Sequence, residues 1–323
     1  MVTTNKQYSY DILLSDIADL QQRYPNCLHR SILGKSVLGR DIPLLTLGKP
    51  SAKTVIWIDA GIHAREYMSC QIVMLALEYL LQRENGEVWP YNTSNTYIWQ
   101  NGQMRLREAS KEAACPPDTG VCFYIAPMLN PDGVELARFG LDSVADRSRH
   151  NALLRMNDQR RDFTYWKANI NGVDLNSNFP AYWQQKDTGV TSPGPQGYKG
   201  PFPVSEAETK SIVAFLQHRM DKSISYHAQG AEIYWYFRQE EPYLTRNLQF
   251  GETLQGLTQY ALMPREDSLS GAGLRDYQIY NYKRLGLTVE IGPASTNAPM
   301  PLSDLPAING RNKKTLWYLW HHS

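Results

Sequence analysis

The apolar positions of the chain follow two patterns, a helical spacing and short continuous runs. Residues 8–22 and 71–82 place apolar side chains three and four positions apart, which predicts a helix in each segment. Residues 54–62 and 123–129 are continuous apolar runs, typical of strands that are buried on both faces. Residues 31–48 hold two shorter apolar runs separated by glycine and charge, which predict a pair of strands.

Polar segments separate these elements in the middle of the chain. Residues 130–133 (Asn-Pro-Asp-Gly) are predicted to form a turn, and the charged residues 140–162 a solvated excursion before Trp166. Residues 187–203 are rich in glycine, proline, serine and threonine, which predicts a surface loop. The sequence Ser-Glu-Ala-Glu that begins at Ser205 fits a capping box, so we expect a helix through about Met220.

Two late apolar runs, residues 223–237 and 284–292, are predicted to be core strands. Strands and helices alternate throughout, and neither an internal repeat nor a linker interrupts them. We therefore expect one domain over residues 1–323, of the α/β class, with a mostly parallel or mixed sheet covered by helices.

Charge and hydropathy exclude several classes of function. The 33 lysines and arginines nearly balance the 32 acidic residues, so a nucleic acid is not an expected partner. No apolar run approaches the roughly 20 residues that span a bilayer, so we expect no membrane span. The chain opens on a polar segment without the features of a secretory signal, which predicts a cytoplasmic protein.

The four cysteines, at positions 27, 70, 115 and 122, show no Cys-x-x-Cys spacing. A zinc ribbon or a thioredoxin-like redox site therefore has no support. Cys115 and Cys122 flank a turn and could form a disulfide in an oxidising compartment. In the cytosol we expect free thiols.

The first candidate chemistry lies in the loop that follows the strand at residues 54–62. His63 and Glu66 are three residues apart there, and His227 ends a later apolar run. Two imidazoles and one carboxylate are the ligands of a catalytic zinc site that keeps an open position. A lone histidine is equally compatible with a hydrogen-bonded core residue.

Glu290 ends another apolar run, Leu-Thr-Val-Glu-Ile-Gly. A carboxylate there is costly to bury unless it meets a metal, a partner or a proton. It could act as a base that takes a proton from water and passes it to a leaving amine. The alternative is a salt-bridged glutamate at the end of a strand.

Taken together, several motifs resemble the zinc carboxypeptidase family. They follow in that family's order: HAREY at 63–67, NPDG at 130–133, GVDLNSNFP at 172–180, SYHAQG at 225–230 and TVEIG at 288–292. The resemblance implies an α/β/α sandwich with a mixed, mostly parallel sheet of about eight strands. It also implies one Zn²⁺ per chain on His63, Glu66 and His227, with Glu290 as general acid and base.

The same resemblance implies a cation that stabilises the oxyanion, and Lys167 lies nearest to the expected place, with Arg161 as a poorer candidate. In carboxypeptidases the GVD motif continues with Asn-Arg, which grips the terminal carboxylate of the peptide. Here the pair is Asn176 and Ser177. Losing a bidentate arginine weakens the requirement for a free α-carboxylate next to the scissile bond.

A second departure concerns substrate selection. The segment SLSGAGLRDYQIY (residues 268–280) lacks the family's tyrosine, and aligning Asp276 and Tyr277 with the family's Asp-Trp pair puts Arg275 at the base of the specificity pocket. An arginine there would favour an acidic side chain. Both departures resemble the bacterial γ-D-glutamyl-L-diamino acid endopeptidases, which implies a murein stem peptide as substrate. The alternative for Arg275 is a surface ion pair.

Three other functions remain open. The chain could be a carboxypeptidase that removes acidic C-terminal residues, or a zinc deacylase of small N-acyl amino acids. Aromatic segments around Trp183 and Trp235 suggest room for a longer substrate than a deacylase needs. From another class, it could be a catalytically inactive peptide-binding module. A serine hydrolase and a phosphate-binding loop lack their motifs.

Overall fold

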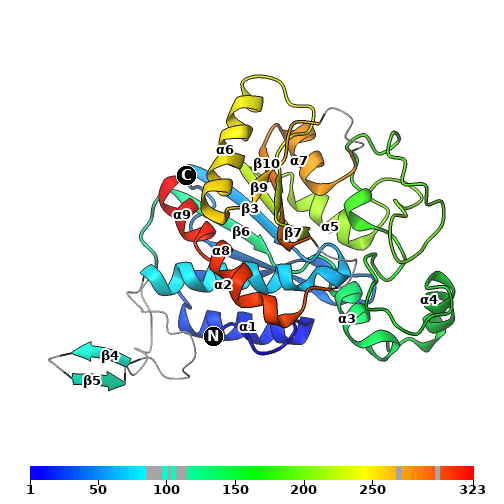
Figure 1. Cartoon of the computed structure of the whole chain (residues 1–323), viewed down its shortest axis with the longest axis horizontal. Coiled ribbons are helices and arrows are strands. Elements are labelled where there is room, and N and C mark those ends of the chain that lie inside the picture. Colours follow the sequence, from blue (N-terminus) through cyan, green and yellow to red (C-terminus); the bar gives the residue numbers. More distant parts are fainter. Residues whose placement is uncertain (85–96, 101–102, 107–114, 267–270, 295–298) are drawn as a thin grey trace.

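A mixed sheet forms the centre of the protein. The computed structural model describes residues 1–84, 97–100, 103–106, 115–266, 271–294 and 299–323. Within these residues the main sheet has eight strands in the order β1-β2-β6-β3-β7-β10-β8-β9 (Figure 1). The strands of the main sheet are β1 (Leu28–Lys35), β2 (Asp41–Leu47), β3 (Thr54–Ala60), β6 (Val121–Ala126), β7 (Lys222–Gly230), β8 (Glu232–Tyr234), β9 (Ala261–Leu262) and β10 (Leu285–Pro293).

The central strands β6, β3, β7 and β10 run parallel, whereas β1, β2 and β8 join the sheet by antiparallel pairing. A separate antiparallel pair is formed by β4 (Tyr97–Gln100) and β5 (Gln103–Leu106). The expected mixed, mostly parallel sheet is therefore confirmed. That residues 1–323 form a single domain stays a prediction.

Helices cover both faces of the sheet. They are α1 (Tyr10–Arg23), α2 (Tyr67–Glu84), α3 (Pro131–Phe139), α4 (His150–Met156), α5 (Ala207–Phe215), α6 (Tyr243–Thr258), α7 (Leu274–Tyr282), α8 (Leu305–Asn312) and α9 (Thr315–His322). Side chains of α1, α2, α6, α8 and α9 share one hydrophobic core with the sheet, and those of α5 and α7 share another. Among the described helices, none combines the length and the apolar character that a membrane crossing requires.

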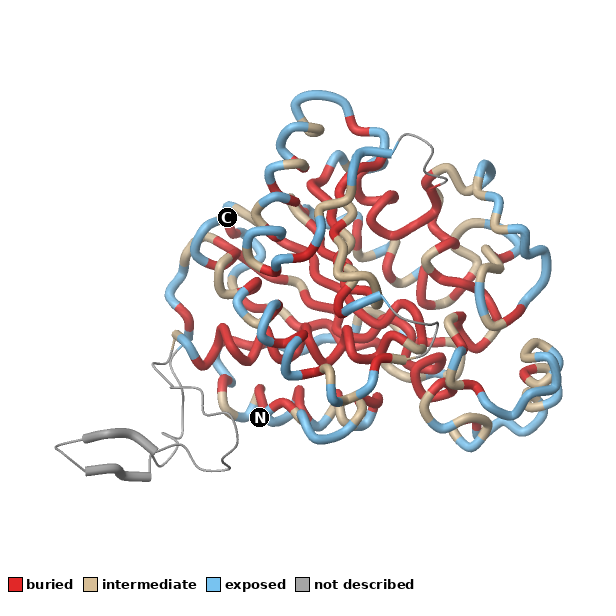
Figure 2. The backbone as a smooth tube through the Cα atoms, viewed as in Figure 1, coloured by how far each residue is buried: buried red, intermediate tan, exposed pale blue. Residues whose placement is uncertain are grey.

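The burial of side chains along the strands and helices follows the apolar pattern of the sequence. On β10, Leu287, Val289 and Ile291 are buried in the core beneath α2 and α6, while Thr288 and Glu290 are partly exposed on the opposite face. Figure 2 shows the buried interior in red, with α2 buried along nearly its whole length. Helices α8 and α9 pack on α2, which explains why this helix carries apolar side chains all round.

Two turn predictions are corrected by the structure. Residues 130–133 do not form a turn: Asn130 precedes α3 and its Oδ1 accepts a hydrogen bond from the Gly133 amide (3.0 Å). Proline is favoured at the first helical position because its missing N–H would have no partner there. The segment therefore begins a helix.

The prediction of a capping box at Ser205 is also wrong. The residue before α5 is Glu206, without a side-chain cap, and Ser205 donates instead to the Glu206 carboxylate (2.7 Å). That carboxylate also accepts from Asn169 (2.8 Å), so tertiary contacts replace the local cap. The helix ends at Phe215 rather than near Met220.

The run 223–237 is two strands rather than one. The chain leaves β7 at Gly230, turns at Ala231 (φ +54°) and continues as β8. Strand β10 lies between them, parallel to β7 and antiparallel to β8. The break therefore carries the chain from one side of β10 to the other.

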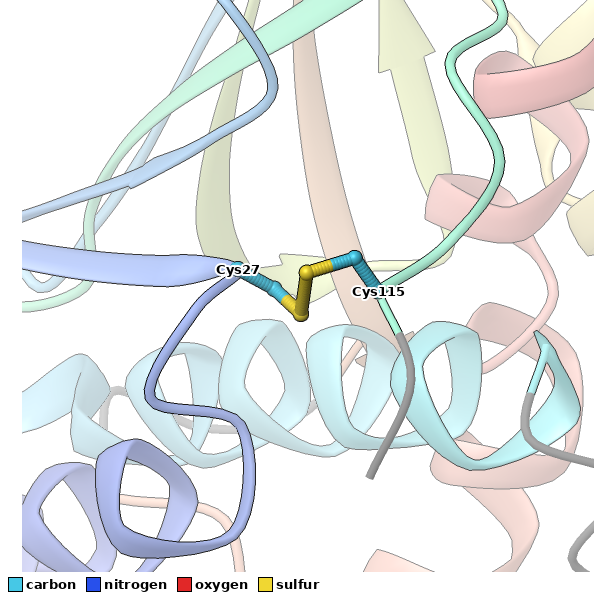
Figure 3. Close-up of a disulfide and its surroundings, with 2 residues drawn as sticks. All are labelled: Cys27 and Cys115. Atoms are coloured by element: carbon cyan, nitrogen blue, oxygen red, sulfur yellow. A yellow bond between two sulfur atoms is a disulfide. The ribbon is translucent and has the colours of Figure 1, made fainter. Parts of the chain in front are cut away.

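The expectation of free thiols is wrong for two of the four cysteines. Cys27, just before β1, forms a disulfide with Cys115, 88 residues later and just before β6 (Figure 3). Cys122, the other partner considered for Cys115, is a free thiol buried in the core, as is Cys70. Pairing between Cys115 and Cys122 does not occur because Cys122 points into the sheet core within β6.

Candidate active site

The loop after β3 holds the first two candidate ligands. β3 ends at Ala60, and Gly61 follows with φ +63°, where a Cβ would collide with the Sγ of Cys70. Glycine is therefore required for this sharp turn. His63 then precedes a short 3₁₀ turn, Ala64–Glu66, that leads directly into α2.

His63, Glu66 and His227 converge on one point. The Nδ1 atom of His63 lies 2.9 Å from Oε1 of Glu66, and the Nδ1 atom of His227 lies 3.2 Å from its Oε2. The two Nδ1 atoms are 3.1 Å apart. All three side chains are buried, and their candidate ligand atoms lie within 4.8 Å of one another.

This arrangement fits a zinc ion. Two ring nitrogens that face each other need a shared cation or proton between them, and the carboxylate supplies a negative charge at the same point. Burial acts to raise the pKa of Glu66. The charges of His63 and His227, and their hydrogen bonds with the carboxylate, outweigh burial and hold this pKa well below its usual range. The group is thus an ionised carboxylate beside two imidazoles, the donor set of catalytic zinc sites.

Asp174 is a member of the site that the sequence reasoning missed. Its Oδ1 lies 3.3 Å from Nε2 of His63, on the ring edge opposite to the ligand nitrogen. Burial acts to raise the pKa of Asp174, but His63 and then Lys167 hold it well below the usual range. A carboxylate behind a ligating histidine fixes the tautomer and orientation of the ring. Its place in the motif GVD, close to Asn176, was the available signal.

Asn130 ties together the two loops that bear His63 and Lys167. Its Nδ2 donates to the carbonyl oxygens of Ile62 (3.2 Å) and Ala168 (3.1 Å). The Ala64 amide also donates to the carbonyl of Lys167 (3.0 Å). Lys167 is half-buried, and its charge lowers the pKa of both Asp174 and Glu290. Arg161, the poorer candidate, is exposed.

Glu290 lies next to His227 across the sheet. The two residues are paired in the register of β10 and β7, so their side chains lie on the same face. Burial raises the pKa of Glu290 to about 7, opposed by the charge of His227 and supported by that of Glu66. A carboxyl group with this pKa can exchange a proton near neutral pH.

The predicted substrate-binding residues gather at the start of α7. Oδ1 of Asn176 accepts a hydrogen bond from the Leu274 amide (2.9 Å), one residue before Arg275. Arg275 uses Nε and Nη2 to bind Asp276, with the shorter contact at 2.5 Å. The ion pair considered as the alternative for Arg275 is therefore present, with Asp276, but it is buried rather than on the surface. Ser177 is buried as well. Residues 268–270 of the aligned segment lie outside the described residues.

The aromatic segments do not form a common binding wall. Trp235 is buried in the core shared with α6, where its indole donates to the Met263 carbonyl (2.9 Å). Trp183 is partly exposed and donates to the Lys199 carbonyl (3.1 Å). Trp235 therefore contributes to the fold rather than to a longer binding cleft.

Comparisons with known proteins agree with this site. A model of the zinc carboxypeptidase family matches residues 13–98 and 119–283, a range that includes His63, Glu66 and His227. The chain is 32% identical over 311 residues to γ-D-glutamyl-L-diamino acid endopeptidase 1 of Lysinibacillus sphaericus, covering 95% of this chain and 71% of that protein.

Solved structures share the fold at low identity. Bovine thrombin-activatable fibrinolysis inhibitor superposes with a TM-score of 0.66 at 19% identity, covering 98% of this chain and 97% of that one. Murein-tripeptide amidase MpaA of Escherichia coli O157 gives 0.54 at 18% identity, covering 94% and 96%. With its matched sequence model, its sheet topology and its His-Glu-His group, the chain belongs to the zinc carboxypeptidase family of metallopeptidases.

Proposed function

We propose that the protein hydrolyses the γ-D-glutamyl–meso-diaminopimelate bond of murein stem peptides. The observation that carries this assignment is the buried Arg275, whose charge acts on Tyr234 near Glu290, in a chain that has Ser177 where carboxypeptidases have an arginine. The relative from Lysinibacillus sphaericus, named as an endopeptidase of γ-D-glutamyl-L-diamino acids, supports the same substrate class.

His63, Glu66 and His227 would hold the zinc ion. Zinc bound there supplies a Lewis acid that polarises the amide carbonyl and makes water easier to deprotonate. Asp174 keeps the Nε2 edge of His63 in place so that Nδ1 faces the metal position.

Glu290 takes a proton from the attacking water and delivers it to the nitrogen of the leaving diamino acid. Its pKa of about 7, raised by burial, suits both steps because the group can accept and release the proton near neutral pH. Lys167, whose charge acts on Asp174 and Glu290, stabilises the negative charge that develops on the carbonyl oxygen.

The leaving diamino acid lies towards Arg275. Its distal carboxylate accepts hydrogen bonds from the guanidinium N–H groups that Asp276 does not hold, while Asn176 Nδ2 supports the peptide near the scissile bond. Ser177 lacks the fork of an arginine, so a free α-carboxylate next to the bond is not required. A further D-alanine on the stem peptide is then tolerated.

The test is a comparison of bonds. The purified, zinc-loaded protein is incubated with L-Ala-γ-D-Glu-meso-diaminopimelate and with Ala-Glu-type acidic peptides, and the products are identified by mass. Release of diaminopimelate without trimming of the acidic peptides is the expected result. Glu290→Gln protein is the control for a contaminating peptidase.

Arg275 also supports a second candidate, a carboxypeptidase that removes acidic C-terminal residues. Trimming of the acidic peptides, with the murein tripeptide left intact, would overturn the murein assignment in favour of this activity. An inactive binding module is not supported, because the three candidate ligands, Glu290 and Lys167 occupy one site. If the protein were such a binding module, neither the murein tripeptide nor the acidic peptides would be cleaved.

The cytoplasm stays a predicted location only. The Cys27–Cys115 disulfide favours an oxidising compartment instead, since cytosolic thiols are kept reduced.

A further inference from the structure

A row of three polar side chains crosses three neighbouring strands in the site. His227 on β7 pairs with Glu290 on β10, and Glu290 pairs with Glu232 on β8. Partners in register point to the same face of a sheet, about 4.8 Å apart. Glu232 therefore lies on the face of the metal site, one strand beyond the base.

This face of the sheet carries polar side chains that are partly exposed. Thr288 and Tyr234 form a second paired row beside the first, and Glu232, Tyr234, Thr288 and Glu290 are all partly exposed. Ile233, between the two residues of β8, is buried on the other side. The polar residues at these positions are therefore partly accessible from solvent.

Glu232 is a carboxylate without a cation of its own. Tyr234 donates a hydrogen bond to its Oε2 (2.7 Å), and in the described part of the chain no Lys, Arg or His lies within ion-pair distance of it. Its charge also raises the pKa of the neighbouring Glu290, after the larger effects of burial and of Glu66. The two neighbouring carboxylates repel each other when both are ionised. A cation bound beside them lowers this repulsion.

Arg275 approaches the same tyrosine from α7. The pKa of Tyr234 is raised to about 12, first by burial and then by Glu232, whereas the charge of Arg275 acts to lower it. The charge of Arg275, which is paired with Asp276, and the charge of Glu232, which has no cationic partner among the described residues, thus both act on Tyr234.

We propose that Glu232 binds the distal ammonium of the substrate's diamino acid while Arg275 binds the carboxylate on the same carbon. This inference rests on the proposed murein function. It restricts the preferred leaving residue of the substrate to one whose side chain ends in both an ammonium and a carboxylate. A substrate that lacks either the ammonium or the carboxylate would bind less well. The protein charge left without its partner would lose solvation by water and gain no contact in return.

Three peptides that differ only at this end test the idea. They carry L-Ala-γ-D-Glu followed by meso-diaminopimelate, by L-lysine, which lacks the distal carboxylate, or by L-2-aminopimelate, which lacks the distal amine. We expect wild-type kcat/KM to be highest for diaminopimelate, by about 10- to 100-fold over each of the others, as expected for a lost hydrogen bond to a charged group.

Glu232→Gln keeps the size of the side chain and the hydrogen bond from Tyr234. We expect it to reduce the preference for diaminopimelate over aminopimelate to about threefold or less, through KM rather than kcat, because it removes the charge that selects an ammonium. Arg275→Met should instead reduce the preference for diaminopimelate over lysine. Glu252→Gln, at an exposed position of α6, is the matched control and should leave both preferences as in wild type.

The outcomes separate the two proposals. If wild type cuts all three γ-D-glutamyl peptides equally, the role of Glu232 is wrong and the murein function stands. The role of Glu232 is also wrong if Glu232→Gln lowers kcat for all three peptides by one factor, since that indicates an effect on Glu290. If wild type cuts none of the three, both proposals fail together.

Discussion

The Nε2 atom of His63 lies 3.3 Å from Asp174, while Nδ1 of the same ring faces Glu66 at 2.9 Å. The imidazole is held between two carboxylates that act on opposite edges. Its orientation therefore depends on a residue that does not itself face the metal position.

We expect Asp174→Asn to weaken zinc binding by about 10- to 100-fold, as is typical for loss of a carboxylate behind a ligating histidine. Competition with a coloured chelator measures the affinity. Asp187→Asn, in an exposed loop, is the control. Unchanged zinc affinity in Asp174→Asn would show that Glu66 and His227 alone fix the ring.

Glu290→Gln should lower kcat by about 10²- to 10⁴-fold because the proton acceptor is lost while the shape of the site is kept. Zinc content and melting temperature should stay close to those of wild type. A variant that retains a tenth or more of the wild-type kcat would assign the base to another residue.

The wild-type pH profile should have an acid limb. Burial raises the pKa of Glu290 to about 7, and the base acts in its ionised form, so activity is lost as pH falls through this pKa. A bound cation favours the ionised form, which moves the midpoint of kcat/KM below 7. An acid limb that persists with the same midpoint in the residual activity of Glu290→Gln would contradict this origin.

Lys167 should be needed for charge stabilisation rather than for binding. We expect Lys167→Met to lower kcat by roughly 10²- to 10³-fold, as for loss of one oxyanion donor, with KM little changed. Lys167→Arg keeps the charge and should recover part of the rate. A larger change in KM than in kcat would place Lys167 among the substrate contacts.

The Cys27–Cys115 disulfide should stabilise the fold. Disulfides typically contribute about 2–4 kcal/mol, largely by restricting the unfolded chain, and a loop of 88 residues lies at or above the upper end of this range. Replacing both residues by serine should lower the melting temperature, and reductant should then have no further effect. Thiol titration of the unreduced, denatured protein should find only Cys70 and Cys122. Four reactive thiols would mean that the bridge does not form.

Glu208 should make stability depend on pH. Burial, and then the nearby Asp132 charge, raises its pKa from 4.5 to about 7 in the folded protein. Because the folded state holds this proton more tightly, the stability it confers is complete below pH 4.5 and is lost as pH rises through about 7.

Urea unfolding at pH 5 and pH 8.5 measures this loss, which should reach at most roughly 3 kcal/mol for Glu208. Glu208→Gln should reduce the difference between the two pH values. Glu252→Gln, which is exposed, should not. An identical pH dependence in wild type and Glu208→Gln would assign the titration to other buried acids.

The sequence predicted the strands of the core and the converging ligands well because both depend on local pattern. His63 follows a buried strand directly, and His227 lies within another, so the parallel sheet brings them to one edge. Asn130 was misread because a proline and a glycine favour a turn as well as a helix start. Only the contacts of its side chain with Gly133, Ile62 and Ala168 distinguish the two.

Long-range relations that no motif marks could not be predicted. Nothing in the spacing of Cys27 and Cys115, 88 residues apart, marks them as partners. Glu232 lies within residues 223–237, which were predicted as one core strand. It reaches Glu290 only because the chain breaks at Ala231 and returns on the other side of β10.

The crossing of the chain over β10 separates the parts of the enzyme that can vary from those that cannot. Strands β7 and β10 carry His227 and Glu290, the proposed metal ligand and base, so a shift in their register would turn both away from the site. β8 is only three residues long and lies outside them. If Glu232 contacts the substrate as proposed, exchanges at Glu232 and Tyr234 should change which residue is released while the chemistry one strand away stays intact.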